Sequence, residues 1–351
     1  MISEKLKKTF LSKEDCLNDI IGQKESKKQL KSAILMNRNI IISGPPGIGK
    51  TTLAKNLSRI LPRKKLVDCA YHCDPENPIC PECKSKLRNN KKLKTIELSG
   101  DNLFVRIQGS PDLTAEDLIG DIDPIKAMKF GPLSIEAFTP GKIFKANNGV
   151  LFFDELNRCP EKLQNALLQV LEERKATISS YDMDIDANFI FIGTMNPKDS
   201  STEKLSDVFL DRFDMVYMNY PESDKIENEI VLKKGKRIVE FPEKLLQGVI
   251  SFIRGLRQDE KLEKFPSVRA SLGIYERAQS NALLDSRKKV CFKDIEDVIV
   301  SVLSHRIKLK PSTKYLIDSR KYIEKEFEKF IESRYSDLHS ESEESKKGDS
   351  P

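Results

Sequence analysis

The chain has 351 residues, enough to bury a sizeable core and to form two or three domains of ordinary size. Charged residues make up 32% of it, and 60 basic against 54 acidic residues give a net charge of +6, a mixed surface that excludes the basic field of a dedicated nucleic-acid binder. No apolar run is long enough to cross a bilayer and residues 1–15 lack a secretory core, so we expect a cytoplasmic protein with no membrane-inserted segment.

The first organised stretch of the chain ends in a candidate phosphate-binding loop. Apolar residues beside a glycine at 17–23 precede a predicted helix over 24–36, and the apolar run 39–43 predicts a buried strand. The strand leads into Gly44-Pro-Pro-Gly-Ile-Gly-Lys-Thr51, which matches G-x-x-x-x-G-K-[ST], and a helix is predicted over 51–60. The nucleotide-binding residues predicted from this pattern are Gly44, Pro45, Pro46, Gly47, Ile48, Gly49, Lys50, Thr51 and Thr52.

Strand, glycine-rich turn and helix in this order favour a nucleoside triphosphate, ATP, as the ligand. Successive backbone N–H groups of the turn and the positive end of the helix dipole point at one spot, which suits an anion. Lys50 would reach the β- and γ-phosphates, and the hydroxyl of Thr51 would ligate a Mg²⁺ ion that bridges them. The alternative, a glycine-rich turn without a ligand, does not account for all three parts in the right order.

Residues 63–94 interrupt the alternation of strands and helices. They are basic, rich in cysteine and punctuated by proline, so we interpret them as an insertion before strand-like runs at 95–98 and 103–107. The cysteines that could hold one tetrahedral Zn²⁺ ion are Cys69, Cys73, Cys80 and Cys83. Their spacing leaves three interpretations open: zinc, with His72 as an alternative ligand, free surface thiols, or a redox-active Cys-x-x-Cys pair.

A second excursion, residues 109–145, leads into the apolar run 150–153, which predicts the second confident strand. Asp154 and Glu155 close this strand. A carboxylate at the carboxyl end of the strand can hold the Mg²⁺ ion that Thr51 also reaches, and a second one can polarise the water that attacks the γ-phosphate. We therefore predict Asp154 as the magnesium ligand and Glu155 as the water-activating group, with capping of the following helix as an alternative role that could coexist.

Helices and strands continue to alternate as far as Pro221, after which the chain looks helical. The predicted elements are a helix over 161–174, a polar β-hairpin over 175–188, and strands over 189–192 and 215–218. Asn196 ends the third strand, where its amide could bind the attacking water or the γ-phosphate, although Asn before Pro is also a common turn signal.

This pattern predicts an α/β domain with a parallel sheet, followed by an all-helical domain. We place the α/β nucleotide-binding domain at 1–225, including both insertions, and the helical domain at 226–335. Residues 336–351 contain Ser, Glu, Lys and Gly without apolar spacing, so we expect a disordered tail.

The order of these motifs resembles that of an AAA+ ATPase. The phosphate loop, the Asp-Glu strand, the polar hairpin and the Asn-ended strand are followed by Leu210-Asp-Arg-Phe-Asp214, and the likeness covers about residues 17–310. More narrowly, the chain is similar to the magnesium-chelatase ATPase subunit and to MoxR-type ATPases, with Phe153-Asp-Glu-Leu-Asn-Arg158 and Leu303-Ser-His-Arg306 among the matching phrases. The resemblance implies an AAA+ P-loop sheet domain with an insertion in helix 2, residues 106–145, and a pre-sensor hairpin, followed by a helical lid.

The resemblance also implies roles for residues that contact the nucleotide. Ile21, Gly22 and Gln23 would lie near the adenine, and Asn196 would be the first sensor. Arg269 would be the second sensor, acting on the nucleotide of its own subunit or of a neighbour. The alternative for Arg269 is an ordinary exposed arginine at a helix start.

Arg212 looks like an arginine finger, which in such proteins completes the site of a neighbouring subunit. A guanidinium at the γ-phosphate stabilises the charge of the transition state, and a monomer would lack it. The alternative is a surface salt bridge with Asp211 or Asp214. The resemblance therefore implies a homo-oligomeric ring, commonly of six subunits, and a larger partner subunit with a von Willebrand A-type domain.

We expect magnesium-dependent ATP hydrolysis that drives remodelling of a partner protein or of a metal-chelatase complex, although no residue pattern shows a porphyrin site. A DNA-translocating helicase uses a similar hairpin and finger, but the hairpin tip at 179–184 is polar to acidic, so nucleic acid is not the expected partner. The non-enzymatic alternative is a nucleotide-gated scaffold that does not hydrolyse ATP effectively. The residues that argue against it are Lys50, Asp154, Glu155 and Arg212.

Overall fold

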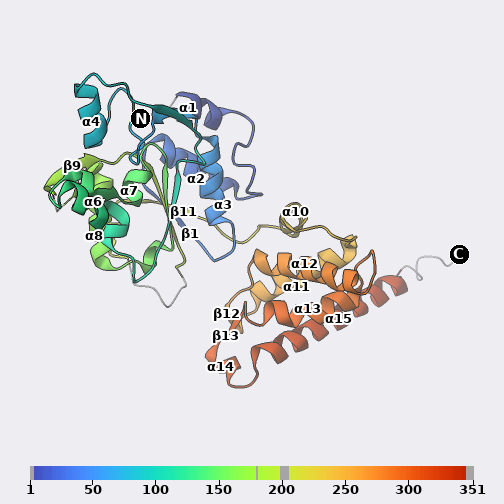
Figure 1. Ribbon diagram of the computed structural model, residues 1–351. Helices are drawn as coiled ribbons and strands as arrows, with labels where there is room; N and C mark the ends of the chain where they lie inside the picture. The colour runs from blue at the N-terminus through green and yellow to red at the C-terminus, as the bar shows by residue number, and fades with distance from the viewer. Residues whose placement is uncertain (1–3, 179–180, 198–204, 345–351) are drawn as a thin grey trace. The chain divides into compact units, whose positions relative to one another are not determined.

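The structure, a computed structural model, describes residues 4–178, 181–197 and 205–344. The chain divides into two compact units, Met1–Asn219 and Tyr220–Pro351 (Figure 1). Each unit has a hydrophobic core of its own. Our prediction placed this division after residue 225. The structure places it earlier because the carbonyl oxygens of Pro221 and Glu222 accept hydrogen bonds from Arg254, a residue of the second unit.

A five-stranded parallel sheet forms the centre of the first unit, with the strand order β11-β1-β10-β7-β4. Its strands are β1 (Ile40–Ser43), β4 (Phe104–Gln108), β7 (Val150–Asp154), β10 (Ile190–Met195) and β11 (Asp214–Tyr217). The predicted parallel sheet is confirmed. Because all strands run the same way, their carboxyl ends meet at one edge, and the register places Gln108 beside Asp154 there.

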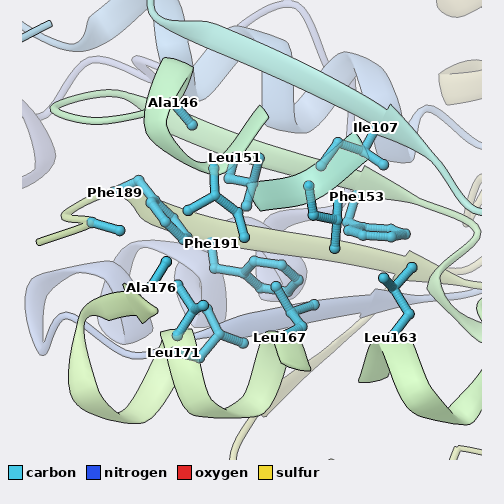
Figure 2. Packing of buried hydrophobic residues seen from close by; sticks show 14 of the residues in the cluster. Ile107, Ala146, Leu151, Phe153, Leu163, Leu167, Leu171, Ala176, Phe189 and Phe191 are labelled. Atoms are coloured by element: carbon cyan, nitrogen blue, oxygen red, sulfur yellow. The ribbon is translucent and has the colours of Figure 1, made fainter. Parts of the chain in front are cut away.

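Helices cover both faces of this sheet, which explains why its strands are continuous apolar runs. The helices are α1 (Glu4–Leu11), α2 (Lys24–Leu35), α3 (Lys50–Ile60), α8 (Glu161–Glu173) and α9 (Asp207–Leu210). Figure 2 shows one core, in which the sheet residues Leu151, Phe153 and Phe191 lie over the α8 residues Leu163, Leu167 and Leu171. On the opposite face, Phe152 and Ile192 pack with Leu53 and Leu57 of α3. Alternate residues of β7 thus anchor both layers, and each such buried side chain contributes about 1.5–3 kcal/mol.

The segment after α3 forms a small lobe on a two-stranded antiparallel sheet. β2 (Lys64–Val67) pairs with β3 (Thr95–Leu98), and helix α4 (Pro81–Arg88) lies between them in the chain. We predicted residues 63–94 as an insertion and did not expect β2 inside it. The strand forms because Leu66 and Val67 are buried. We call residues 68–94, which the two strands enclose, the cysteine lobe.

The excursion after β4 is built from short elements. They are α5 (Ala115–Ile119), β5 (Gly120–Ile122), α6 (Pro124–Phe130), the 3₁₀ helix η1 (Ile135–Ala137), β6 (Phe138–Pro140) and α7 (Lys142–Lys145), with β5 and β6 paired. The pattern placed the start of this excursion at residue 109, whereas the resemblance placed the insertion at 106–145; the earlier start is wrong, because Arg106 to Gln108 still pair with β7. We call residues 109–145 the helical insertion.

The predicted hairpin contacts this helical insertion. Its strands are β8 (Lys175–Ile178) and β9 (Met183–Asp186), and Ser179 and Ser180 at its tip lie outside the described residues. The hydroxyl of Tyr181 donates to the carbonyl oxygen of Ser134 at 2.9 Å, and its ring meets Phe138 edge to face. The hairpin and the helical insertion therefore form one continuous surface.

The second unit is mainly helical. Its helices are α10 (Asp224–Lys234), α11 (Glu243–Gln258), α12 (Val268–Leu284), α13 (Phe292–Leu303), α14 (Pro311–Lys314) and α15 (Ser319–Glu344). We predicted no strand here, but β12 (Leu262–Lys264) pairs with β13 (Lys308–Leu309), which brings the buried residues Leu262 and Leu309 opposite each other. The unit is also held by the fully buried Glu227, whose carboxylate accepts two hydrogen bonds from Arg257, at 2.6 and 2.8 Å, and one from Ser271.

Helix α15 differs from our prediction of a disordered tail over 336–351, because it continues to Glu344. Extending an existing helix fixes one more residue for each hydrogen bond gained, so polar residues can continue a helix that they would not start. Residues 345–351 lie outside the described residues. Neither α15 nor any other helix in the described ranges has both the length and the apolar composition that crossing a bilayer requires.

Candidate active site

The phosphate loop joins β1 to α3 at the carboxyl edge of the sheet. Its backbone requires glycine at two positions: Gly49 has a φ of +100°, and a Cβ at Gly44 would lie 2.3 Å from the carbonyl oxygen of Met218. Gly49 is the N-cap of α3 and has no side chain to compete for the first N–H groups of that helix. Lys50 Nζ donates to the carbonyl oxygens of Gly44 and Pro45, at 2.5 and 2.9 Å. The loop thus combines backbone N–H donors with one ammonium group, an arrangement that suits phosphate.

The remaining predicted loop residues take the expected places. Pro46, Gly47 and Ile48 complete the turn, and Thr51 and Thr52 lie in the first turn of α3. The predicted adenine segment, Ile21 to Gln23, lies beside this loop. Gln23 Nε2 donates to the carbonyl oxygen of Asn219 at 2.6 Å, and a Cβ at Gly49 would meet the Cδ1 atom of Ile20 at 2.9 Å.

Thr51 and Asp154 come together next to the loop. Thr51 Oγ1 lies 3.5 Å from Asp154 Oδ2, so both oxygens could ligate one ion, and a hydroxyl with a carboxylate is the oxygen donor set that Mg²⁺ prefers. Two other side chains hold the carboxylate: Thr194 Oγ1 donates to Oδ1 and Arg106 Nη2 donates to Oδ2, each at 2.6 Å. Asp154 is therefore oriented by its surroundings.

Glu155 has a left-handed backbone, with a φ of +55°, which costs a non-glycine residue about 1–2 kcal/mol. Gln108 Nε2 donates to Glu155 Oε2 at 2.9 Å, and an Arg158 nitrogen lies 3.2 Å from the same oxygen. The N–H of Glu155 donates to Thr194 Oγ1 at 3.0 Å. Backbone strain beside a candidate magnesium ligand is typical of functional sites.

The capping alternative for the two carboxylates is not supported. Glu155 is the N-cap of a 3₁₀ helix, η2 (Leu156–Arg158), but makes no side-chain cap hydrogen bond, and α8 begins after Pro160. Asp154 is already engaged by the side chains described above. Both carboxylates therefore belong to the cluster at the edge of the sheet.

Asn196 directly follows β10, as predicted. Its carbonyl oxygen accepts a hydrogen bond of 3.4 Å from Asn157 Nδ2, which ties it to the turn after β7. The structure thus brings Asn196 near the carboxylate cluster through its backbone. Its role as first sensor stays a prediction.

The two candidate arginines are not part of the elements that carry the carboxylate cluster. Arg212 follows α9, and its guanidinium donates to the Glu172 carboxylate of α8 and to the carbonyl oxygen of Val208. The alternative named Asp211 or Asp214 as its salt-bridge partner, but Asp214 pairs with Arg38 at 3.1 Å. Arg269 is exposed in the first turn of α12, in the second unit, so its sensor role also stays a prediction.

The four clustered cysteines converge in the cysteine lobe. All four are free, and their sulfur atoms lie within 4.8 Å of one another. The interpretation as surface thiols is wrong for Cys73, Cys80 and Cys83, because all three are buried. Burial raises the pKa of the Cys83 thiol to about 12, whereas hydrogen bonding with Cys73 and Cys80 lowers the pKa of the Cys69 thiol. The redox-active interpretation stays a prediction.

Sequence reasoning missed three residues of the site: Arg106, Gln108 and Thr194. The first two stand two residues apart and therefore share a face of β4, but only the pairing of β4 with β7 brings them to the carboxylates. Polar residues at alternate positions at a strand end were an available signal. Thr194 lies in the apolar strand β10, beyond its predicted end at residue 192.

Known families and proteins match this chain along most of its length. The family model described as ATPase family associated with various cellular activities (AAA) matches residues 86–215, and a model of the AAA lid domain matches residues 264–324. The chain thus combines an α/β sheet domain and a phosphate loop with a helical unit, and over these matched residues it is similar to AAA+ ATPases with a helical lid. Within that class it resembles the ATPase subunit of magnesium chelatase: the model of magnesium chelatase subunit ChlI matches residues 16–71.

Individual relatives agree with this result. The magnesium-chelatase subunit ChlI of Mesostigma viride is 27% identical over 346 residues, which are 88% of this chain and 91% of that protein. The uncharacterized protein YeaC of Bacillus subtilis is 24% identical over 84% of this chain and 85% of its own length. Among solved structures, NtrX from Brucella abortus in complex with ADP has a TM-score of 0.50 and 16% identity, over 88% of this chain and 63% of that one, a likeness of fold alone.

We expect the substitution Thr194→Val to weaken the use of magnesium. Valine keeps the shape of threonine but removes the hydrogen bond that orients Asp154 Oδ1 and the acceptor of the Glu155 N–H. Losing such a partner of a metal ligand typically costs 10–100-fold in metal affinity, so the Mg²⁺ concentration for half-maximal ATPase activity should rise at least about tenfold. The matched control is Thr177→Val on the hairpin strand β8. Equal magnesium requirements for both variants would contradict this role of Thr194.

Proposed function

We propose that this AAA+ ATPase hydrolyses ATP with Mg²⁺ at sites formed between neighbouring subunits of a homo-oligomeric ring, commonly of six subunits. The observation that carries the proposal is the meeting of Thr51, Asp154 and Glu155 beside the phosphate loop. The chain's own residues supply phosphate binding, a magnesium site and a carboxylate for the attacking water.

In this proposal each part of the cluster has a chemical task. The loop and Lys50 hold the phosphates, and Thr51 and Asp154 hold the ion that screens their charge when it is bound. Glu155 accepts a proton from the attacking water, and Gln108 keeps its carboxylate in place at 2.9 Å. Arg106 and Thr194 act as positioning residues because they touch Asp154 and would not touch the nucleotide in this role.

The position of Arg212 supports a site shared between subunits. Its hydrogen-bond partners, Glu172 and Val208, lie outside the cluster, and its side chain is 33% exposed. A partly exposed guanidinium that is engaged away from its own phosphate loop is suited to reach the loop of another subunit. There it would stabilise the charge that develops on the γ-phosphate.

We further propose that the ring remodels a partner protein, either a metal-chelatase complex or, as in MoxR-type ATPases, another target, with a von Willebrand A-type subunit as its partner. Relatives named as magnesium-chelatase subunits support the first version. The helical insertion supports a protein-binding surface, since Ile125, Met128 and Leu133 are 80%, 91% and 86% exposed. The Tyr181 contact would let this surface and the hairpin move together.

The dependence of ATPase activity on protein concentration tests the shared site. We expect turnover per subunit to rise with concentration, in parallel with the mass measured by light scattering, because subunits lack the finger until they assemble. Activity per subunit that stays constant while the protein dissociates to a monomer would overturn the proposal. Activity that is absent at every concentration, with ATP still bound, would instead support the non-hydrolysing scaffold.

A DNA-translocating motor remains a weaker candidate, since no feature of the described residues favours it. The hairpin strand β9 carries Asp184 and Asp186, whose charges repel phosphate. Turnover that is the same with and without DNA would agree with a protein target.

A further inference from the structure

The cysteine lobe contains a cluster of side chains that the proposed ATP hydrolysis does not use. Its four cysteines, Cys69, Cys73, Cys80 and Cys83, belong to neither the phosphate loop nor the carboxylate cluster. The case for a second metal rests on the geometry of the cluster itself. The sulfur atoms lie within 4.8 Å of one another. A tetrahedral Zn²⁺ ion with Zn–S bonds of about 2.3 Å requires sulfurs about 3.8 Å apart, so small shifts would complete the site.

The local backbone directs N–H donors at three of the four sulfur atoms. The N–H groups of Cys73, Cys80 and Cys83 donate to the sulfur atoms of Cys69, Cys73 and Cys80 respectively, each at 3.4 Å. Cys80 is also the N-cap of α4, so the positive end of that helix adds to the effect. Four buried or half-buried thiols without disulfides gain little from this arrangement unless they hold a cation.

The surroundings of the cluster suit a closed, structural ion. Val67 and the partly buried apolar residues Tyr71, Ile79 and Leu93 pack around the sulfurs. His72, which the sequence left as an alternative ligand, contacts the carbonyl oxygen of Lys145 through Nδ1 at 2.9 Å. Four cysteines without an open position are typical of structural zinc sites.

We propose that Cys69, Cys73, Cys80 and Cys83 bind one structural Zn²⁺ ion that holds the cysteine lobe in its fold. The folded lobe is hydrogen-bonded to and packed against the segment that precedes β7. Asn147 Nδ2 donates to the carbonyl oxygen of Tyr71 and Asn148 Nδ2 to that of His72, each at 3.0 Å, and Tyr71 packs on Phe144 with ring centroids 5.2 Å apart. By holding the lobe folded, the ion also stabilises the segment before β7, the strand that ends in Asp154.

Elemental analysis of the full chain, purified without chelator, tests this proposal. We expect close to one zinc per chain, and displacement with an organomercurial should release it to a chromogenic chelator in equal amount. Cys80→Ser should lower the zinc content to below about a tenth, whereas Cys159→Ser, a buried cysteine outside the lobe, should leave it unchanged. Neither measurement involves nucleotide, so failure of this proposal is distinguishable from failure of the proposed ATPase mechanism.

Metal identity is checked on the same protein. Replacing the ion with Co²⁺ should give the visible absorption of a tetrahedral cobalt thiolate in the wild type and in Cys159→Ser, and not in Cys80→Ser. Iron in place of zinc would overturn the assignment of the metal. Folded wild-type protein that is free of metal, with all four lobe thiols open to titration, would overturn the site.

Discussion

The variant Glu155→Gln should bind ATP as the wild type does but lose turnover by about 10²–10⁴-fold, the usual contribution of a positioned general base. Glutamine keeps the size of the side chain and can still contact Gln108 and Arg158, but it cannot take a proton from water. Steady-state ATPase assays give kcat, and equilibrium titration with a fluorescent nucleotide gives the affinity. Binding is retained because the phosphate loop and Lys50 are untouched.

Glu161→Gln is the matched control for this substitution. Glu161 is an exposed carboxylate in the first turn of α8, a few residues further along the chain, and its removal should leave kcat within about twofold. A kcat for Glu155→Gln that equals that of the control would remove Glu155 from the mechanism. Loss of ATP binding in Glu155→Gln would instead point to a structural role for its strained backbone.

The variant Arg212→Ala should lose about 10³-fold or more in kcat while ring assembly and ATP affinity are kept, as expected for an arginine finger. The lost ion pair with Glu172 joins two partly exposed side chains, so its effect on stability is small. Arg88→Ala, at an exposed position of α4, is the control for loss of a surface guanidinium. Unchanged turnover in Arg212→Ala would contradict the assignment.

Mixing two inactive variants distinguishes a finger that acts between subunits from one that acts within a subunit. Arg212→Ala keeps an intact Lys50, and Lys50→Ala keeps an intact Arg212. In an equimolar mixture about a quarter of the interfaces unite a complete phosphate loop with a complete finger, so about a quarter of wild-type turnover should return. A mixture as inactive as its components, with mixed rings shown by mass, would place Arg212 in the site of its own subunit.

Much of the fold followed from the sequence because its signals are local. The five strands of the sheet are short apolar runs between turns, and helix α8 has leucines at helical spacing, so both could be located without tertiary information. The octet Gly44–Thr51 and the pair Asp154-Glu155 each follow a predicted strand. Both could therefore be placed at the carboxyl ends of the parallel strands, where the nucleotide site was expected. The strands β2, β5, β6, β12 and β13 were missed because they are only two to four residues long and lie in segments without a sustained apolar pattern.

The part of the site that could not be predicted depends on which strands are neighbours. Arg106 and Gln108 reach the two carboxylates only because β4 pairs with β7 in a register that places Gln108 beside Asp154. Four cysteines in a short segment likewise indicate a metal site, but their convergence depends on how the cysteine lobe folds over β2 and β3. Long-range pairing therefore determines the details that local patterns leave open.

The ion pair between Arg106 and Asp154 also affects the order in which Mg²⁺ and ATP bind to the site. A free Mg²⁺ ion would have to compete with a guanidinium for a carboxylate oxygen, with the Thr51 hydroxyl as its other protein ligand in the cluster. A Mg²⁺ ion that is already bound to ATP has phosphate oxygens among its ligands. It would therefore give up fewer water ligands on entering the site than a free ion would. We therefore expect the ion to arrive and leave with the nucleotide, while Arg106 balances the charge of the Asp154 carboxylate between turnovers.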